Sequence, residues 1–183
     1  MLSEDLYYLL GNFAGDGWFE SRGISIGTKS LLRAKHLAKL IENVFNKKPK
    51  IKQRVYKDGH SLYIVSIYSV VIEILFRDLL GNPVKYKSKN FIIPNLKNKN
   101  LLRAFIRGIF EAEAYNYFWY NKPRISFEIF NKQASEKIFK EISEDGIKCS
   151  LSNIKKGGYR IDITGVNETS KFNNLYNVIF HRE

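Results

Sequence analysis

The sequence predicts an α+β fold built from two pseudo-symmetric halves, each with the element order αββαββα. Two apolar helical runs lie about a hundred positions apart and share one pattern of small and acidic residues. Each run is followed by the same succession of strands and helices. The hairpin turns at Gly59 and Gly157 are separated along the chain by almost the same distance as the acids Asp16 and Glu113. An internal repeat explains this agreement.

The first half, residues 1–81, begins with a helix that Ser3 caps and Gly17 ends. The acids Glu4 and Asp5 stabilise the positive end of its dipole. Strand alternation, helical periodicity and a turn signal at Asp58-Gly59 predict the rest. In order, we expect strands over 18–22 and 24–28 around a turn at Gly23, a helix over 31–45, strands over 50–56 and 62–68, and a helix over 70–80.

The second half, residues 100–183, repeats this order after a Lys- and Asn-rich linker over 82–99. Polar and apolar residues alternate along 124–130, as expected for a strand with one buried face. Lys85, Lys87 and Lys89 of the linker are candidates for phosphate contact or for plain solvent exposure. We expect a helix over 100–112, strands over 115–120 and 124–130 around a turn at 121–123, a helix over 134–144, a hairpin around Gly157-Gly158, and a helix over 167–179.

The two repeated runs are 9–17 and 106–114, and each has small residues four positions apart. Small residues let two helices approach backbone to backbone. The small residues are Gly11, Gly15, Gly108 and Ala112. An acid, Asp16 or Glu113, directly precedes the residue that closes each run. The pattern therefore predicts two packed helices whose C-terminal ends bring the two carboxylates together.

A carboxylate at a helix C-terminus is unfavourable, because the negative end of the dipole and the last carbonyls both repel an anion. Two such groups side by side also repel each other. A hard cation such as Mg²⁺ relieves this repulsion, since it prefers carboxylate and carbonyl oxygens. The pair indicates metal-assisted phosphodiester hydrolysis. In the alternative interpretation, Asp16 and Glu113 are ordinary acids that mark helix ends.

Both runs resemble the LAGLIDADG motif of homing endonucleases, and the chain is similar to a monomeric, two-motif member of the archaeal intron-encoded type. Ile93-Pro94 and the run 101–110 are similar to the family's usual lead into its second motif. The resemblance implies that the two antiparallel sheets form a DNA-binding saddle, with the motif helices packed at the interface between the halves.

The resemblance also implies the roles of individual residues. Asp16 and Glu113 take the metal-binding catalytic positions, each cleaving one strand, and the carbonyls of Gly15 and Ala112 help to hold the metal. Ala114 departs from the family, which has Gly there, and we expect its Cβ to strain a left-handed conformation.

The family often places a basic residue near each centre. Lys29 and Lys132 match those places, or they are surface lysines beside helix starts.

The polar side chains of the predicted strands are candidates for DNA contact. The net charge is +12, spread along a chain with 11 Tyr and 13 Phe, which favours a polyanionic partner. Side chains on a β-ribbon can reach base edges in the major groove. The alternative is that they form the solvent face of amphipathic strands. The candidates are Lys50, Lys52, Arg54, Arg124, Ser126, Glu128, Arg160 and Asp162.

Other classes of protein fit poorly. Cys149 is the single cysteine, so no intramolecular disulfide forms, as expected in a reducing compartment. His36, His60 and His181 match no zinc spacing. No apolar run reaches the length of a membrane span, and the N-terminus lacks the features of a signal peptide. We therefore expect an intracellular (cytoplasmic), soluble protein that does not associate with membranes.

The leading hypothesis is a site-specific double-strand DNA homing endonuclease, monomeric, with Mg²⁺ or another divalent cation as cofactor. It would hydrolyse phosphodiester bonds at a long asymmetric target, as in intron homing. Two alternatives on the same fold remain: an RNA maturase with intron RNA as its partner, and a catalytically inactive DNA-binding protein.

Overall fold

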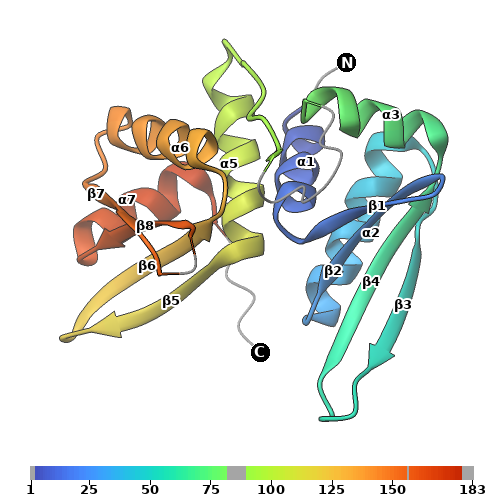
Figure 1. Ribbon diagram of the computed structural model, residues 1–183, viewed down its shortest axis with the longest axis horizontal. Helices are drawn as coiled ribbons and strands as arrows, with labels where there is room; N and C mark the ends of the chain where they lie inside the picture. Colours follow the sequence, from blue (N-terminus) through green and yellow to red (C-terminus); the bar gives the residue numbers. More distant parts are fainter. Residues whose placement is uncertain (1–2, 82–89, 156, 179–183) are drawn as a thin grey trace.

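The computed structural model describes residues 3–81, 90–155 and 157–178, in two halves that meet at a central helix pair (Figure 1). Each half is a four-stranded antiparallel sheet with helices packed on one face, so the predicted α+β class is confirmed. In each half the chain passes through a helix, two strands, a helix, two strands and a helix, as the repeat predicts.

The first half contains three helices and the sheet with strand order β1-β2-β4-β3. Its elements are α1 (Glu4–Asp16), β1 (Gly17–Glu20), β2 (Gly23–Thr28), α2 (Leu31–Phe45), β3 (Lys50–Val55), β4 (Ser61–Tyr68) and α3 (Val70–Leu79). Ser3 and Ser30 cap α1 and α2 by accepting hydrogen bonds from backbone N–H groups. The core side of this sheet carries Ile24, Ile26, Val65 and Ile67, all buried under the helices.

The second half repeats the arrangement with strand order β5-β6-β8-β7. Its elements are α5 (Lys99–Glu113), β5 (Ala114–Trp119), β6 (Lys122–Ile129), α6 (Lys132–Glu144), β7 (Cys149–Asn153), β8 (Tyr159–Thr164) and α7 (Val166–Tyr176). Ile125, Phe127, Ile161 and Ile163 form the core side of the sheet. The expected alternation along β6 is therefore present.

Two turns lie one or two residues from their predicted places. Gly23 belongs to β2, and the preceding turn is formed by Ser21 and Arg22. A Cβ at Gly23 would lie 2.2 Å from the Ile67 carbonyl oxygen, so the glycine permits close strand packing and makes no turn. The second turn uses Tyr120 and Asn121, both with positive φ, which suits the twist of a two-residue hairpin.

The predicted linker is only partly described. Lys85, Lys87 and Lys89 lie outside the described residues. Beyond that gap, Phe91 and Ile93 are buried in the core, and the Asn131 side chain donates a hydrogen bond to the Phe91 carbonyl oxygen at 2.7 Å. The end of this segment therefore packs with the second half. Among the helices of the described ranges, none is long and apolar enough to cross a membrane.

Candidate active site

Helices α1 and α5 touch backbone to backbone where Gly11 meets Gly108. A Cβ at Gly11 would lie 2.0 Å from the Phe105 carbonyl oxygen, and one at Gly108 would lie 2.2 Å from the Tyr8 carbonyl oxygen. No side chain fits at these distances. The predicted close helix packing is present, and it fixes how the two helix ends lie relative to each other.

The two acids occupy equivalent places, since Asp16 is the last residue of α1 and Glu113 is the last residue of α5. A Cβ at Gly15 would lie 2.5 Å from the Ala112 Cβ and 3.4 Å from Glu113 Oε1. The Glu113 carboxylate therefore lies against the residue that precedes Asp16. Helix packing brings the two acidic helix ends together.

Arg33 of α2 contacts the first acid. Its Nη1 lies 3.4 Å from Asp16 Oδ2, and its Nη2 donates to Asn12 Oδ1 at 2.6 Å. Asn12 is fully buried and Arg33 is 8% exposed. The Arg33 Nε is buried and has no hydrogen-bond partner within the described structure. This guanidinium orients the Asp16 side chain from a fixed, protein-enclosed position.

The surroundings of the second acid differ. Glu113 and Glu128 line a small cavity with Gly15, Phe91 and Phe130. Arg160 and Tyr115 hold the Glu128 carboxylate: Arg160 Nη2 lies 2.6 Å from Glu128 Oε1, and the Tyr115 hydroxyl donates to the same oxygen at 3.4 Å. Burial raises the pKa of Tyr115, and Glu128 adds to this effect while Arg160 opposes it. The hydroxyl therefore stays protonated as a donor.

Two carboxylates alone are an incomplete set of ligands for a divalent cation. Within the described ranges, no three His, Cys, Asp or Glu side chains gather as a metal-binding group. Mg²⁺ is commonly held by one or two carboxylates completed by water and substrate phosphate. Asp16 and Glu113 would be such a pair. The carbonyls of Gly15 and Ala112 lie in the last turns of α1 and α5. They follow the carbonyls of Phe13 and Phe110, which accept hydrogen bonds from the backbone N–H groups of the C-cap residues Gly17 and Ala114.

The two predicted basic residues lie on the surface. Lys29 is exposed between β2 and α2. Lys132 is exposed at the first position of α6, and its Nζ lies 3.8 Å from Glu136 Oε1 one turn along the same helix.

The expectation that Ala114 is strained is wrong. Ala114 has φ −88° and ψ 152°, an extended conformation open to any residue, and Gly17 has nearly the same values, −94° and 167°. The motif glycine has a steric role instead. A Cβ at Gly17 would lie 2.3 Å from the Phe13 ring, so the first motif depends on glycine to make room for that side chain.

The strand residues predicted to contact DNA lie on the sides of the sheets opposite the core. Strand register places Lys50, Lys52 and Arg54 with Ser25 and Ser66; together with Trp18 and Glu20, these residues form the first polar face. The second polar face consists of Tyr115, Tyr117, Arg124, Ser126, Glu128, Arg160 and Asp162. Ser126 and Asp162 were expected to be accessible to DNA, but both residues are buried, with exposed fractions of 0% and 5%.

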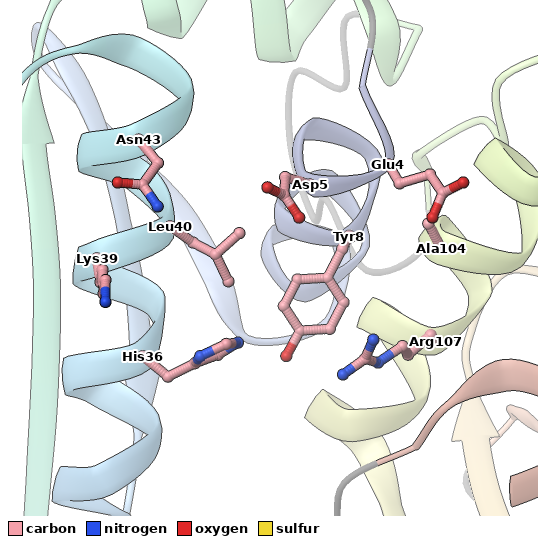
Figure 2. A pocket seen from close by; sticks show the side chains of 9 residues that line it. All are labelled: Glu4, Asp5, Tyr8, His36, Lys39, Leu40, Asn43, Ala104 and Arg107. Atoms are coloured by element: carbon pink, nitrogen blue, oxygen red, sulfur yellow. The ribbon is translucent and has the colours of Figure 1, made fainter. Parts of the chain in front are cut away.

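A second cluster joins the halves near the start of α1. Figure 2 shows Tyr8 directed between His36 of α2 and Arg107 of α5. The Tyr8 hydroxyl donates to Glu111, which also pairs with Arg107 at 2.9 Å. Burial raises the pKa of Tyr8, and the charge and hydrogen bond of Glu111 raise it further. This buried, protonated tyrosine links α1 to α5 and has no direct part in the acid pair.

Sequence reasoning missed two groups of residues. Arg33 lies in an amphipathic helix among other charged residues, and only its helical spacing from the apolar stripe of α2 could have suggested that it faces α1. Tyr115 and Tyr117 alternate along β5 on the same side, a period-two signal that was available.

Comparison with known proteins agrees with this architecture. Residues 3–80 match the family model described as a LAGLIDADG-like domain. The full-length DUF199/WhiA protein from Thermatoga maritima superposes with a TM-score of 0.67 and 16% identity, over 97% of this chain and 56% of that one. The chain thus spans little more than half of that relative's length. No curated protein matches the chain.

The homing endonuclease I-DmoI has the same fold over its whole length. Its complex with DNA and Mn superposes with a TM-score of 0.66 and 20% identity, over 100% of this chain and 99% of that one. Its complex with DNA and Ca gives 0.67 and 20%, over 96% and 90%. The chain therefore carries a LAGLIDADG-like domain over residues 3–80, and over its whole length it has the fold of the homing endonuclease I-DmoI.

Proposed function

We propose that this protein is a site-specific DNA homing endonuclease that cuts both strands of a long asymmetric target. The observation that carries the proposal is the pair of acids, Asp16 and Glu113, at the ends of two helices in backbone contact. Both acids come from one chain, so a monomer suffices. Two different halves favour an asymmetric target.

Each part of the site has a chemical task in this proposal. Asp16 and Glu113 would hold a divalent cation, Mg²⁺ in the first instance. When bound, the cation supplies positive charge that activates water and stabilises the leaving oxygen. Arg33 fixes the direction of the Asp16 carboxylate. The two polar faces hold the duplex so that a phosphodiester of one strand lies beside Asp16 and a phosphodiester of the other strand lies beside Glu113.

The complexes of I-DmoI with DNA and Mn, Mg or Ca support both the partner and the cofactor. The fold alone does not fix the reaction, because DUF199/WhiA shares it equally well. A DNA-binding protein without catalysis is therefore the second candidate. The relatives named here give no support to intron RNA as a partner.

Cleavage of a mixed-sequence duplex library in Mg²⁺, with sequencing of the cut ends, tests the proposal. We expect one long site to be enriched, cut in both strands at a fixed offset. Asp16→Asn and Glu113→Gln, which keep the shape of each side chain and remove its charge, should each leave one strand intact. Tight retention of the library without metal-dependent cutting would favour the second candidate.

A further inference from the structure

The two polar faces differ in whether their basic side chains form ion pairs. The first polar face carries three basic side chains on one strand, Lys50, Lys52 and Arg54, all exposed. Within the described part of the chain, no carboxylate lies within ion-pair distance of these three. The single acid on this face, Glu20, accepts hydrogen bonds from Trp18 and Ser25 at 2.8 Å each.

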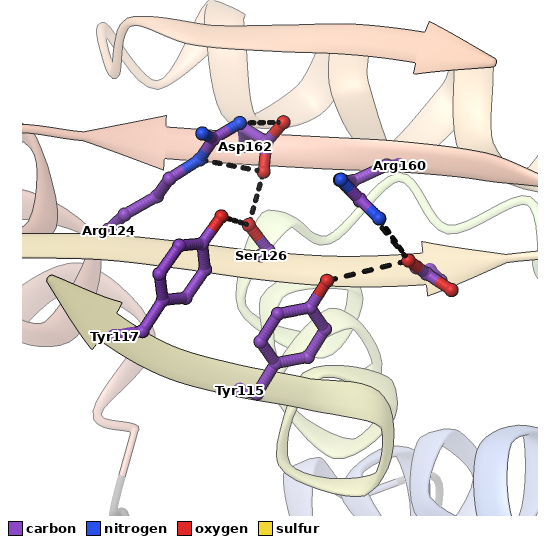
Figure 3. A network of polar contacts seen from close by, with 7 residues as sticks. Tyr115, Tyr117, Arg124, Ser126, Arg160 and Asp162 are labelled. Atoms are coloured by element: carbon purple, nitrogen blue, oxygen red, sulfur yellow. Dashed lines mark hydrogen bonds and ion pairs between the residues drawn. The ribbon is translucent and has the colours of Figure 1, made fainter. Parts of the chain in front are cut away.

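The second polar face is neutralised by its own residues. Arg124 Nη2 lies 2.5 Å from Asp162 Oδ2, and Arg160 Nη2 lies 2.6 Å from Glu128 Oε1. Two arginines and two carboxylates give a formal charge of zero. Figure 3 shows Arg124 of β6 reaching across to Asp162 of β8, and strand register places Glu128 of β6 directly opposite Arg160 of β8. Each guanidinium is therefore held by a carboxylate of the neighbouring strand.

Tyrosines and a buried serine complete this network. The Ser126 hydroxyl donates to Asp162, and the Tyr117 hydroxyl lies 3.3 Å from Ser126 Oγ. The rings of Tyr115 and Tyr117 stack with centroids 5.6 Å apart (Figure 3). Such a network loses little side-chain entropy on binding, because its members are already ordered.

The consequences for DNA differ between the faces. A phosphate that approaches the first polar face meets two ammonium groups and the Arg54 guanidinium, which lies over the Tyr56 ring at 5.1 Å and has no carboxylate partner among the described residues. Neutralisation of the phosphate releases counterions. A phosphate that approaches the second polar face must compete with Glu128 and Asp162 for arginines that are already paired. Base edges are better partners there, since they offer neutral donors and acceptors to ordered tyrosine and guanidinium groups.

We infer that the two halves divide the work of DNA binding. The first polar face supplies the salt-dependent attraction to the backbone. The second polar face reads bases in its half of the target and adds little to the salt dependence. This inference rests on the proposed function, because it takes duplex DNA as the partner.

Removing a carboxylate from the second polar face tests the division. Glu128→Gln keeps the shape of the side chain and frees Arg160 for phosphate. Binding to a labelled mixed-sequence duplex is measured in EDTA over a range of salt concentrations. The slope of log K against log salt should steepen by about 0.9, the contribution of one added phosphate contact. Asp162→Asn should act in the same way through Arg124.

Two comparisons make the result specific. Glu144→Gln removes an equal charge from an ion pair on α6, where Glu144 pairs with Lys140 at 3.7 Å away from the polar faces, and should leave the slope unchanged. Lys50→Ala with Lys52→Ala should flatten the slope by about 1.8, or two contacts. In sequences selected from the library by binding, Glu128→Gln should lose base preference in one half of the site only.

The outcomes separate the two proposals. If the wild-type protein retains no duplex even at low salt, the proposed function fails. If it binds DNA but Glu128→Gln and Asp162→Asn leave both the slope and the base preferences unchanged, the division between the faces is wrong. A lysine pair that does not alter the slope would also overturn it.

Discussion

Replacing Gly108 with alanine tests the helix contact that positions the two acids. The new Cβ would lie 2.2 Å from the Tyr8 carbonyl oxygen and 2.8 Å from the Asn12 nitrogen, both backbone atoms of the facing helix. A carbon and a carbonyl oxygen normally stay about 3.3 Å apart. The helices must therefore separate locally by about 1 Å, because no flexible side chain can give way.

Two effects of opposite sign decide the outcome. Alanine is favoured over glycine inside a helix by about 1 kcal/mol. Overpacking costs about 3 kcal/mol at the upper end of its usual range, which applies here because backbone opposes backbone. We expect a net loss of about 2 kcal/mol in the free energy of unfolding. A displacement of this size at the acids should also slow cleavage by about 100-fold.

Urea unfolding and single-turnover cleavage measure these two effects. Gly27→Ala is a matched control, since its Cβ would meet only the ends of the Trp18 and Leu62 side chains at 3.3 and 3.4 Å. The control should unfold near the wild-type midpoint. A Gly108→Ala protein that is as stable as wild type, or more so, would refute the reasoning about the helix contact.

Three further substitutions follow from the structure. Arg33→Met should slow the cut assigned to Asp16 by about 10-fold and spare the other strand, so that nicked plasmid accumulates; equal slowing of both cuts would contradict this. Asp145→Asn should lower the free energy of unfolding by about 2 kcal/mol at pH 7, because the amide lacks the negative charge and one of the two oxygens that accept hydrogen bonds from Arg103. Burial raises the pKa of Asp145, but the hydrogen bonds outweigh burial and lower the pKa below 3.8. The stabilisation is therefore fully present above 3.8 and is lost as the pH falls through the lowered pKa of the folded state. Chemical unfolding at several pH values should therefore show the two proteins converging in acid. Ala114→Gly should leave cleavage unchanged, since Ala114 is extended, and should lower the free energy of unfolding by about 0.5–1 kcal/mol, as measured by thermal unfolding. A gain in activity would indicate that Ala114 is strained after all.

Local chemistry made much of the fold predictable. Ser3 and Ser30 cap helices whose apolar spacing is regular, and α2 spans Leu31–Phe45 as expected. The helix contact at Gly11 and Gly108 was predicted because small residues spaced four apart on an apolar helix face allow a second helix to approach closely. These features depend on neighbours in the sequence or on an internal repeat.

The remaining features depend on which strands and helices meet. The pairing of Arg33 with Asp16 joins α2 to α1; helical spacing can place Arg33 on the side of α2 that faces α1, but it does not identify Asp16 as the partner. Alternation along β6 gave the correct side for Ser126 but not its burial, because Tyr117 and Asp162 come from other strands. The placement of Gly23 depends on its contact with β4, a strand far along the chain.

The outer strand β3 also affects how the protein behaves in concentrated solution. It forms one edge of its sheet, and Ile51 and Val55 on it are 40% and 65% exposed. Such an edge is a template for pairing with a second copy, and charged side chains along it prevent that. Lys50, Lys52 and Arg54 therefore also keep the molecules apart by mutual repulsion. A variant that lacks all three should self-associate through β3, so losses of DNA binding are best measured one or two substitutions at a time.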